Sequence, residues 1–203
     1  MRLALAQLDP LIGDLEGNAA RILRAGWRAA AHGAELLLTP ELSLWGYPPR
    51  DLLLRPALVE RQAARLQALA DGLPCGMAAL VGVADPVPGG GIPGLWNAVA
   101  LVRGGGGWQV VAHKRLLPSY DVFDESRYFL PGQRPALLEL GQRPGGGGWR
   151  LGLSICEDLW VEQDLQQQRV AGVDPIGELA ALGVDLLLNL SASPYGRGKL
   201  ALR

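Results

Sequence analysis

Cysteine and histidine are scarce in this sequence. Of its 203 residues, only Cys75 and Cys156 are cysteine, and only His32 and His113 are histidine. Two cysteines do not form a disulfide framework, and isolated histidines do not make a metal cluster. We therefore expect a protein of the reducing cytoplasm that binds no metal.

Long apolar runs and an excess of one charge are also missing. No uninterrupted apolar run reaches the ~18 residues of a membrane span. Asp9 and Pro10 interrupt the N-terminal stretch too early for a secretory signal. The 19 basic and 20 acidic residues leave a net charge of −1, and no basic block stands out. Neither a membrane nor a nucleic acid is expected as a partner.

Glycine, by contrast, is abundant, with 28 residues, about twice its average usage. Many of the glycines lie in clusters at 89–91, 104–107 and 145–148. A phosphate-binding loop would need a helix directly after it, but Trp108 and Trp149 each open another strand-like run. The clusters therefore predict flexible links between strands.

The hydrophobic pattern alternates between helical and strand-like segments, which predicts an α/β fold. No linker separates two domains and no repeat of fixed period occurs, so a single domain is expected over residues 1–203. The expected helices lie at 15–31, 50–70, with Pro56 near its start, and 175–182. The expected strands lie at 3–7, 36–39, 77–84, 96–102, 110–116, 137–140, 150–156 and 184–190.

Cys156 closes the apolar run of "LGLSICEDLW", at the carboxyl end of an expected strand. Active groups of α/β folds gather at such ends, so Cys156 is a candidate nucleophile. A buried core cysteine is the other interpretation, and the position alone favours it. Cys75 has no charged neighbour in "LPCGMAALVG", which predicts a core cysteine more strongly.

A nucleophilic thiol needs a base or a nearby cation. His113 and Lys114 are neighbours on an expected strand, so their side chains should point to opposite faces. A Cys–His dyad therefore requires that His113, and not Lys114, faces the site. His32 lies near the end of the first helix and is expected to be a solvated helix terminus.

Carboxylates are the alternative bases. Glu41, in "LLLTPELSLWGY", is poorly solvated, which raises a carboxyl pKa and favours a general base; pairing with an arginine or capping a turn is equally open. Lys114 is either an ordinary strand-end lysine or a cation directed at a developing oxyanion. Glu125, in "FDESRYF", either holds that lysine in place or is a surface loop carboxylate.

Four motifs resemble the nitrilase-like carbon–nitrogen hydrolases, and within them the glutaminase domain of glutamine-dependent NAD synthetase. The resemblance covers essentially the whole chain and implies an α-β-β-α sandwich, which we expect to be incomplete at its C-terminal end. The motifs are "TPELSLWGYPPRDLL", "HKRLLPSYDVFDESRYFLPG", "SICEDLW" and "NLSASPY".

The resemblance implies a role for each matching residue. It makes Glu41 the general base, Lys114 the stabiliser of the oxyanion, Cys156 the nucleophile and Glu125 a second glutamate that orients the site. It also implies contacts with glutamine at four further positions. These are Tyr47, Tyr120, Glu157 and Ser193.

The implied reaction releases ammonia from glutamine through a thioester, and the ammonia passes to a synthetase domain. No "SGGxDS" loop occurs here, so that domain, with its ATP and Mg²⁺, is expected to be absent from this chain, which needs no cofactor of its own. A homo-oligomer is expected when the protein is complete. Two alternatives stay open: another amidase of the superfamily, or an inactive fragment that requires a missing C-terminal portion.

Overall fold

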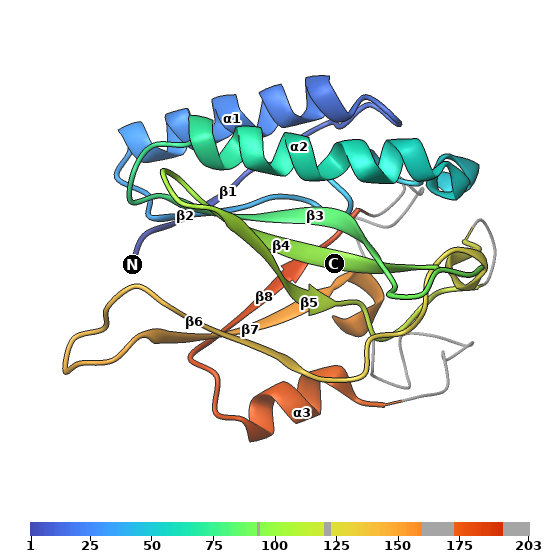
Figure 1. Ribbon diagram of the computed structural model, residues 1–203. Coiled ribbons are helices and arrows are strands. Elements are labelled where there is room, and N and C mark those ends of the chain that lie inside the picture. The colour runs from blue at the N-terminus through green and yellow to red at the C-terminus, as the bar shows by residue number, and fades with distance from the viewer. Residues whose placement is uncertain (93, 120–122, 160–172, 193–203) are drawn as a thin grey trace, which may run out of the picture.

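Two β-sheets pack face to face between two helical layers in the computed structural model of the protein (Figure 1). The structure describes residues 1–92, 94–119, 123–159 and 173–192. In Figure 1, helices α1 and α2 lie above the first sheet and helix α3 lies below the second. This arrangement is the predicted α-β-β-α sandwich.

The first sheet has five strands in the order β1-β2-β3-β4-β5. β1, β2 and β3 are parallel, whereas β4 is antiparallel to both β3 and β5. Two βαβ units place both long helices on one face. The elements are β1 (Leu3–Leu5), α1 (Leu15–Ala31), β2 (Leu36–Leu38), α2 (Pro56–Gly72), β3 (Ala78–Pro86), β4 (Leu95–Arg103) and β5 (Trp108–His113).

The second sheet has three strands in the order β6-β7-β8. β6 and β7 are antiparallel, and β7 and β8 are parallel and joined through α3. The elements are β6 (Ala136–Leu140), β7 (Trp149–Ile155), α3 (Pro175–Ala181) and β8 (Leu186–Leu190).

The strands of the first sheet are apolar on both faces because both faces are covered. Along β2, Leu37 packs in the core below the helices, whereas Leu36 and Leu38 pack in the core between the sheets. Leu151 and Leu188 approach that inner core from the second sheet. Because successive side chains of a strand point to opposite faces of the sheet, one apolar run contributes to two separate cores.

The predicted helix over 50–70 is wrong at its start. Residues Arg50–Leu54 form a short 3-10 helix, and α2 begins at Pro56. Proline suits the first position of a helix because its φ is already helical and its missing N–H would have no partner there. The predicted first helix is confirmed, and the side chain of Asp14 caps it by accepting from the Gly17 N–H at 2.8 Å.

The glycine clusters connect strands, as predicted. Residues 89–91 lie between β3 and β4, residues 104–107 between β4 and β5, and residues 145–148 between β6 and β7. The prediction for Cys75 is wrong, because this residue is exposed in the turn between α2 and β3. No helix in the described part of the chain is long and apolar enough to cross a lipid bilayer.

Strand direction brings three chain segments to one end of the sandwich. β5 runs parallel to β2, so the residues after both strands lie at the same edge of the first sheet. β5 ends at His113 and β7 at Ile155, so Lys114 and Cys156 lie just beyond the strands in which the sequence placed them. The segments after strand ends are where α/β folds carry functional groups.

Candidate active site

A fully buried ion cluster lies at this edge. The Lys114 Nζ donates to Glu41 Oε1 at 2.7 Å and to Glu125 Oε1 at 2.8 Å. The lysine side chain has 0% exposure, and the side chains of Glu41 and Glu125 have 0% and 6%. The structure therefore brings together the three charged residues that the sequence singled out.

Lys114 remains a cation in this environment. Burial by itself lowers the pKa of a lysine, but the negative charges of Glu41 and Glu125 outweigh it and raise the pKa of Lys114 above its usual value. A permanently charged ammonium cannot serve as a base at neutral pH. It can stabilise negative charge that develops beside it.

Cys156 lies next to this cluster. It is buried, and its φ of 44° lies in the left-handed region, which non-glycine residues rarely adopt. Burial raises the pKa of the thiol, and the Glu41 carboxylate, to which the thiol hydrogen-bonds, raises it further, while Lys114 partly opposes the shift. The resting thiol is consequently neutral, with a carboxylate in place to accept its proton.

Glu41 is fixed by groups from three strand ends. Its Oε1 also accepts from the Asn97 side-chain amide of β4 at 2.8 Å, and its Oε2 accepts from the Ala192 N–H beyond β8 at 3.2 Å. The Asn97 carbonyl oxygen accepts from the Lys114 N–H at 2.7 Å. Asn97 therefore holds both the carboxylate and the backbone of its cationic partner.

Gly82 of β3 lets the Glu41 loop approach the sheet. A Cβ at this position would lie 2.2 Å from the Leu42 nitrogen and 2.6 Å from the Pro40 carbonyl oxygen. The Leu44 N–H donates to the Gly82 carbonyl oxygen at 3.1 Å. Only glycine permits this backbone-to-backbone contact, which sets the height of Glu41 above the sheet.

Glu125 shares one oxygen between two donors. Its Oε1 accepts from Lys114 and from the Tyr47 hydroxyl at 2.8 Å, while its buried Oε2 has no hydrogen-bond partner among the residues that the structure describes. Burial raises the pKa of Glu125 from 4.5 to about 7; the charge of Lys114 opposes this rise and that of Glu41 adds to it. Glu125 therefore titrates close to neutral pH.

Replacement of Glu125 by glutamine is expected to change the pH dependence of stability. Between pH 4.5 and 7 the folded protein keeps a proton on Glu125 that the unfolded chain has released, so the free energy of unfolding falls as the pH rises. The pKa rise corresponds to on the order of 3 kcal/mol. Denaturant unfolding at several pH values gives the difference in unfolding free energy between Glu125→Gln and the wild type. Between pH 4.5 and pH 8 this difference should shift by that amount in favour of the variant.

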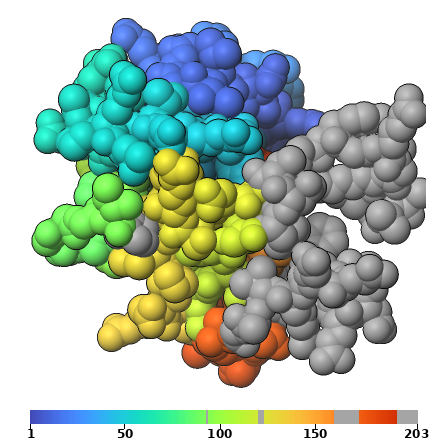
Figure 2. All heavy atoms as spheres, turned by 90° about the vertical axis from the view of Figure 1, so that its right-hand side faces the viewer, coloured from blue at the N-terminus to red at the C-terminus, as the bar shows by residue number. Residues whose placement is uncertain are grey.

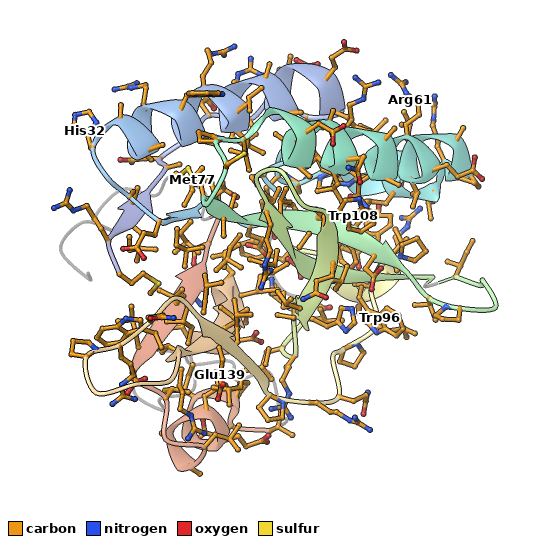
Figure 3. The ribbon with its side chains drawn as sticks, turned by 60° about the vertical axis from the view of Figure 1, so that its left-hand side comes forward. His32, Arg61, Met77, Trp96, Trp108 and Glu139 are labelled. Carbon is orange, nitrogen blue, oxygen red and sulfur yellow. The ribbon has the colours of Figure 1, made fainter. Side chains whose placement is uncertain are left out.

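The matched control is Glu139→Gln on β6, which removes an exposed carboxyl (Figure 3). Its unfolding curve should run parallel to that of the wild type across the same pH range. Parallel curves for Glu125→Gln as well would contradict the buried, partly protonated state of Glu125.

Two cavities flank the cluster. One of about 480 Å³ contains Glu41 in its wall, and one of about 420 Å³ contains Glu125. Tyr47 and Phe123 line both, with ring centroids 6.4 Å apart. Figure 2 shows the segment that carries Phe123, in yellow, between α2 and α3 on this side of the molecule. A glutamine-sized molecule fits the volume of either cavity.

Of the four predicted substrate contacts, the structure describes two. Tyr47 lines both cavities, and its hydroxyl donates to Glu125 rather than pointing away from the cluster. Glu157 is buried directly after Cys156. Tyr120 and Ser193 lie outside the described residues.

The alternative Cys–His dyad is wrong. His113 Nε2 lies 2.7 Å from Asp85 Oδ2, and its ring stacks on Trp96 with centroids 4.6 Å apart. His113 therefore lies apart from the buried cluster that holds Lys114, as the alternation along the chain predicted. His32 is exposed at the end of α1, as expected for a helix terminus (Figure 3).

Two residues of the site were not predicted from the sequence. Asn97 is a single amide inside the apolar run "LWNAVALV", and a polar residue in such a run is a signal that could have identified it. The other residue is Asp158, which accepts hydrogen bonds from three backbone N–H groups, and no pattern in the sequence indicates this.

Known proteins are similar to this sequence over nearly its full length. The family model described as carbon-nitrogen hydrolase matches residues 2–174. The glutamine-dependent NAD(+) synthetase of Synechocystis is 45% identical over 204 residues, which are 99% of this chain and 35% of that protein. The Thermotoga maritima synthetase is 38% identical over 207 residues, 100% of this chain and 32% of that protein. The chain thus spans about a third of the length of these relatives.

Solved structures agree with the sequence relatives. The glutamine-dependent NAD+ synthetase of Acinetobacter baumannii matches with a TM-score of 0.80 and 31% identity, over 99% of this chain and 34% of that one. A Nesterenkonia amidase of the nitrilase superfamily matches with a TM-score of 0.75 and 26% identity, over 98% of this chain and 68% of that one. The predicted resemblance is confirmed, and the chain belongs to the carbon-nitrogen hydrolase family.

Proposed function

We propose that this chain hydrolyses the side-chain amide of glutamine through a cysteine thioester. The observation that carries the proposal is the buried cluster of Glu41, Lys114 and Glu125 directly beside the Cys156 thiol. A nucleophile, a base and a fixed cation are the groups that acyl transfer from an amide requires. The similarity to glutamine-dependent NAD synthetases supports glutamine as the amide.

The first step is attack by sulfur on the amide carbon. Glu41 takes the proton of the neutral Cys156 thiol, and the thiolate adds to the carbonyl to form a tetrahedral oxyanion. Lys114 and the backbone N–H of Glu157 stabilise that oxyanion. Because burial keeps the resting thiol protonated, its proton passes to Glu41 as sulfur attacks the amide carbon.

The second half returns the enzyme to its starting state. Glu41 gives its proton to the leaving nitrogen, the carbon–nitrogen bond breaks, and ammonia and a γ-glutamyl thioester result. Glu41 then takes a proton from a water molecule, which attacks the thioester carbonyl. The carbon–sulfur bond breaks, the thiol regains a proton, and glutamate leaves. These steps use only side chains and one backbone N–H of this chain, together with water.

We further propose that the ammonia supplies a synthetase domain. The relatives are named glutamine-dependent NAD(+) synthetases, and this chain matches about a third of their length. ATP and Mg²⁺ then belong to the synthetase domain, and the complete protein assembles as a homo-oligomer. Tyr47, Glu157, Tyr120 and Ser193 are proposed to contact the glutamine.

The test compares glutamine with a simple aliphatic amide such as propionamide. With released ammonia as the readout, kcat/KM for glutamine should be at least about 100-fold higher than for propionamide. The reason is that propionamide lacks the charged groups of an amino acid, so the polar groups that would bind them stay unpaired. The assay is run with the complete protein.

One observation favours a second candidate, a general aliphatic amidase. The Nesterenkonia amidase shares the fold over 98% of this chain. Preference for propionamide over glutamine would support that candidate and overturn the glutaminase proposal.

A further inference from the structure

One buried carboxylate connects the two segments that carry Lys114 and Cys156. Oδ1 of Asp158 accepts from the Arg115 N–H at 3.0 Å and from the Leu116 N–H at 2.8 Å. Its Oδ2 accepts from the Ile155 N–H at 3.0 Å. The carboxylate therefore touches the residue before the cysteine and the two residues after the lysine.

These two segments belong to different sheets. Lys114 follows β5 of the first sheet, and Cys156 follows β7 of the second. Hydrophobic contacts between the sheets are non-directional, whereas hydrogen bonds fix a distance and a direction. A carboxylate that is 2% exposed and accepts three N–H groups resists shifts of one sheet against the other, because charge-assisted hydrogen bonds are strong in a low-dielectric interior.

The backbone at Cys156 also needs support. Its φ of 44° is held in the left-handed region, and a strained conformation persists only where the surroundings fix it. The bond from the Ile155 N–H to Asp158 closes the turn around Cys156 from one residue before it to two residues after it.

We infer that Asp158 is a positioning residue that holds the Cys156 turn and the Lys114 segment in register. The inference rests on the proposed function and deepens it, because the bonds of Asp158 set where the sulfur lies relative to the cation. Asp158 acts through Ile155, Arg115 and Leu116 and does not touch the substrate.

Asparagine cannot replace the carboxylate fully. It has the same shape, but it offers one acceptor oxygen and one donating NH₂ group. If the oxygen keeps Arg115 and Leu116, the NH₂ group faces the Ile155 N–H, and two donors oppose each other. The turn around Cys156 then loses its closing bond, so Asp158→Asn is the decisive variant.

The expected result for Asp158→Asn is a split between chemistry and binding. A displacement of about 1 Å at a reacting group reduces rates on the order of 100-fold. We expect kcat for glutamine to fall by at least that factor while KM changes less than about threefold. Alkylation of Cys156 by a glutamine-like diazoketone should slow by the same factor as kcat.

A small neutral thiol reagent distinguishes a positioning role from a general disturbance of the structure. Methyl methanethiosulfonate needs a reachable sulfur but no oxyanion stabilisation. Its reaction with Cys156 should be unchanged or faster in Asp158→Asn. The matched control is Glu178→Gln, which removes the exposed partner of the Arg115 side chain at 2.7 Å but leaves the Arg115 N–H bonded to Asp158; its rates should equal those of the wild type.

Wild-type rates in folded Asp158→Asn, or an equal loss with both thiol reagents, would overturn the inference. If this variant does not fold, Asp158→Glu replaces it, because it keeps both oxygens but displaces them by one methylene. A loss of kcat of at least tenfold with an unchanged methanethiosulfonate rate supports the inference, and wild-type kcat overturns it. Absence of glutamine hydrolysis in the wild type would instead overturn the proposed function, and the inference with it.

Discussion

Replacement of Cys156 by alanine is expected to abolish glutamine hydrolysis while the protein stays folded. Without sulfur no thioester forms, and the remaining oxyanion donors cannot supply a nucleophile, so the rate should fall by a factor of about 10⁴ or more. The change removes one atom from the inner core, where Cys156 is 8% exposed. The ammonia assay measures the first expectation, and a thermal unfolding scan measures the second.

Cys75→Ala is the matched control. Cys75 is exposed in the turn between α2 and β3, so the variant should keep full activity and an unchanged unfolding temperature. Residual hydrolysis by Cys156→Ala at more than about one hundredth of the wild-type rate would contradict a nucleophilic role for this sulfur.

The second large effect is expected for Lys114→Met. This variant leaves Glu41 and Glu125, both buried, without the ammonium that lies within 2.8 Å of each. Removing one partner of a buried ion pair costs about 3–5 kcal/mol, because the remaining charge stays in the interior uncompensated. Activity should fall below detection as well, since the oxyanion loses its cation.

Arg115→Met is the control for the loss of a cation from the same segment. The Arg115 side chain pairs with Glu178, whose side chain is 40% exposed and returns to water when the arginine is removed. Because the remaining carboxylate regains water and no charge is left buried without a partner, the loss of stability should be smaller than for Lys114→Met. Denaturant unfolding should therefore separate the two variants, and equal losses of stability would contradict the account of the buried cluster.

The sequence predicted most of the fold because its signals are local. The helical spacing of apolar residues identified α1, and a short apolar run closed by Pro40 identified β2, within one or two residues. The error at 50–70 has a local cause too, because Arg50–Leu54 form a 3-10 helix of their own and Pro56 marks the first position of α2. Cys75 was misplaced because an apolar neighbourhood does not show that the chain turns at the surface.

The site was predicted through its positions and through a family resemblance. Glu41, Lys114 and Cys156 all follow strands, and strand ends meet at one edge of a sheet. Which partner Glu41 takes was left open, and the structure pairs it with Lys114 rather than with an arginine. Glu41 and Lys114 are 73 residues apart in the chain, so no periodic pattern of the sequence predicts their contact.

Asn97 and Asp158 show what the sequence could not supply. Asn97 bonds to Glu41, 56 residues away, and Asp158 bonds to backbone groups more than 40 residues away. The Asn97 contact depends on how the strands of the first sheet are ordered, and the Asp158 contacts depend on how the two sheets are stacked. The donors to Asp158 are backbone N–H groups, which every residue except proline carries, so residue type gives no signal there.

The most direct test of the central claim, that Cys156 is the activated nucleophile of the Glu41 and Lys114 cluster, is peptide mapping by mass spectrometry after treatment with a glutamine-like diazoketone. One adduct is expected, on Cys156, although Cys75 is the more exposed thiol. Equal labelling of both cysteines, or labelling of Cys75 alone, would contradict this claim.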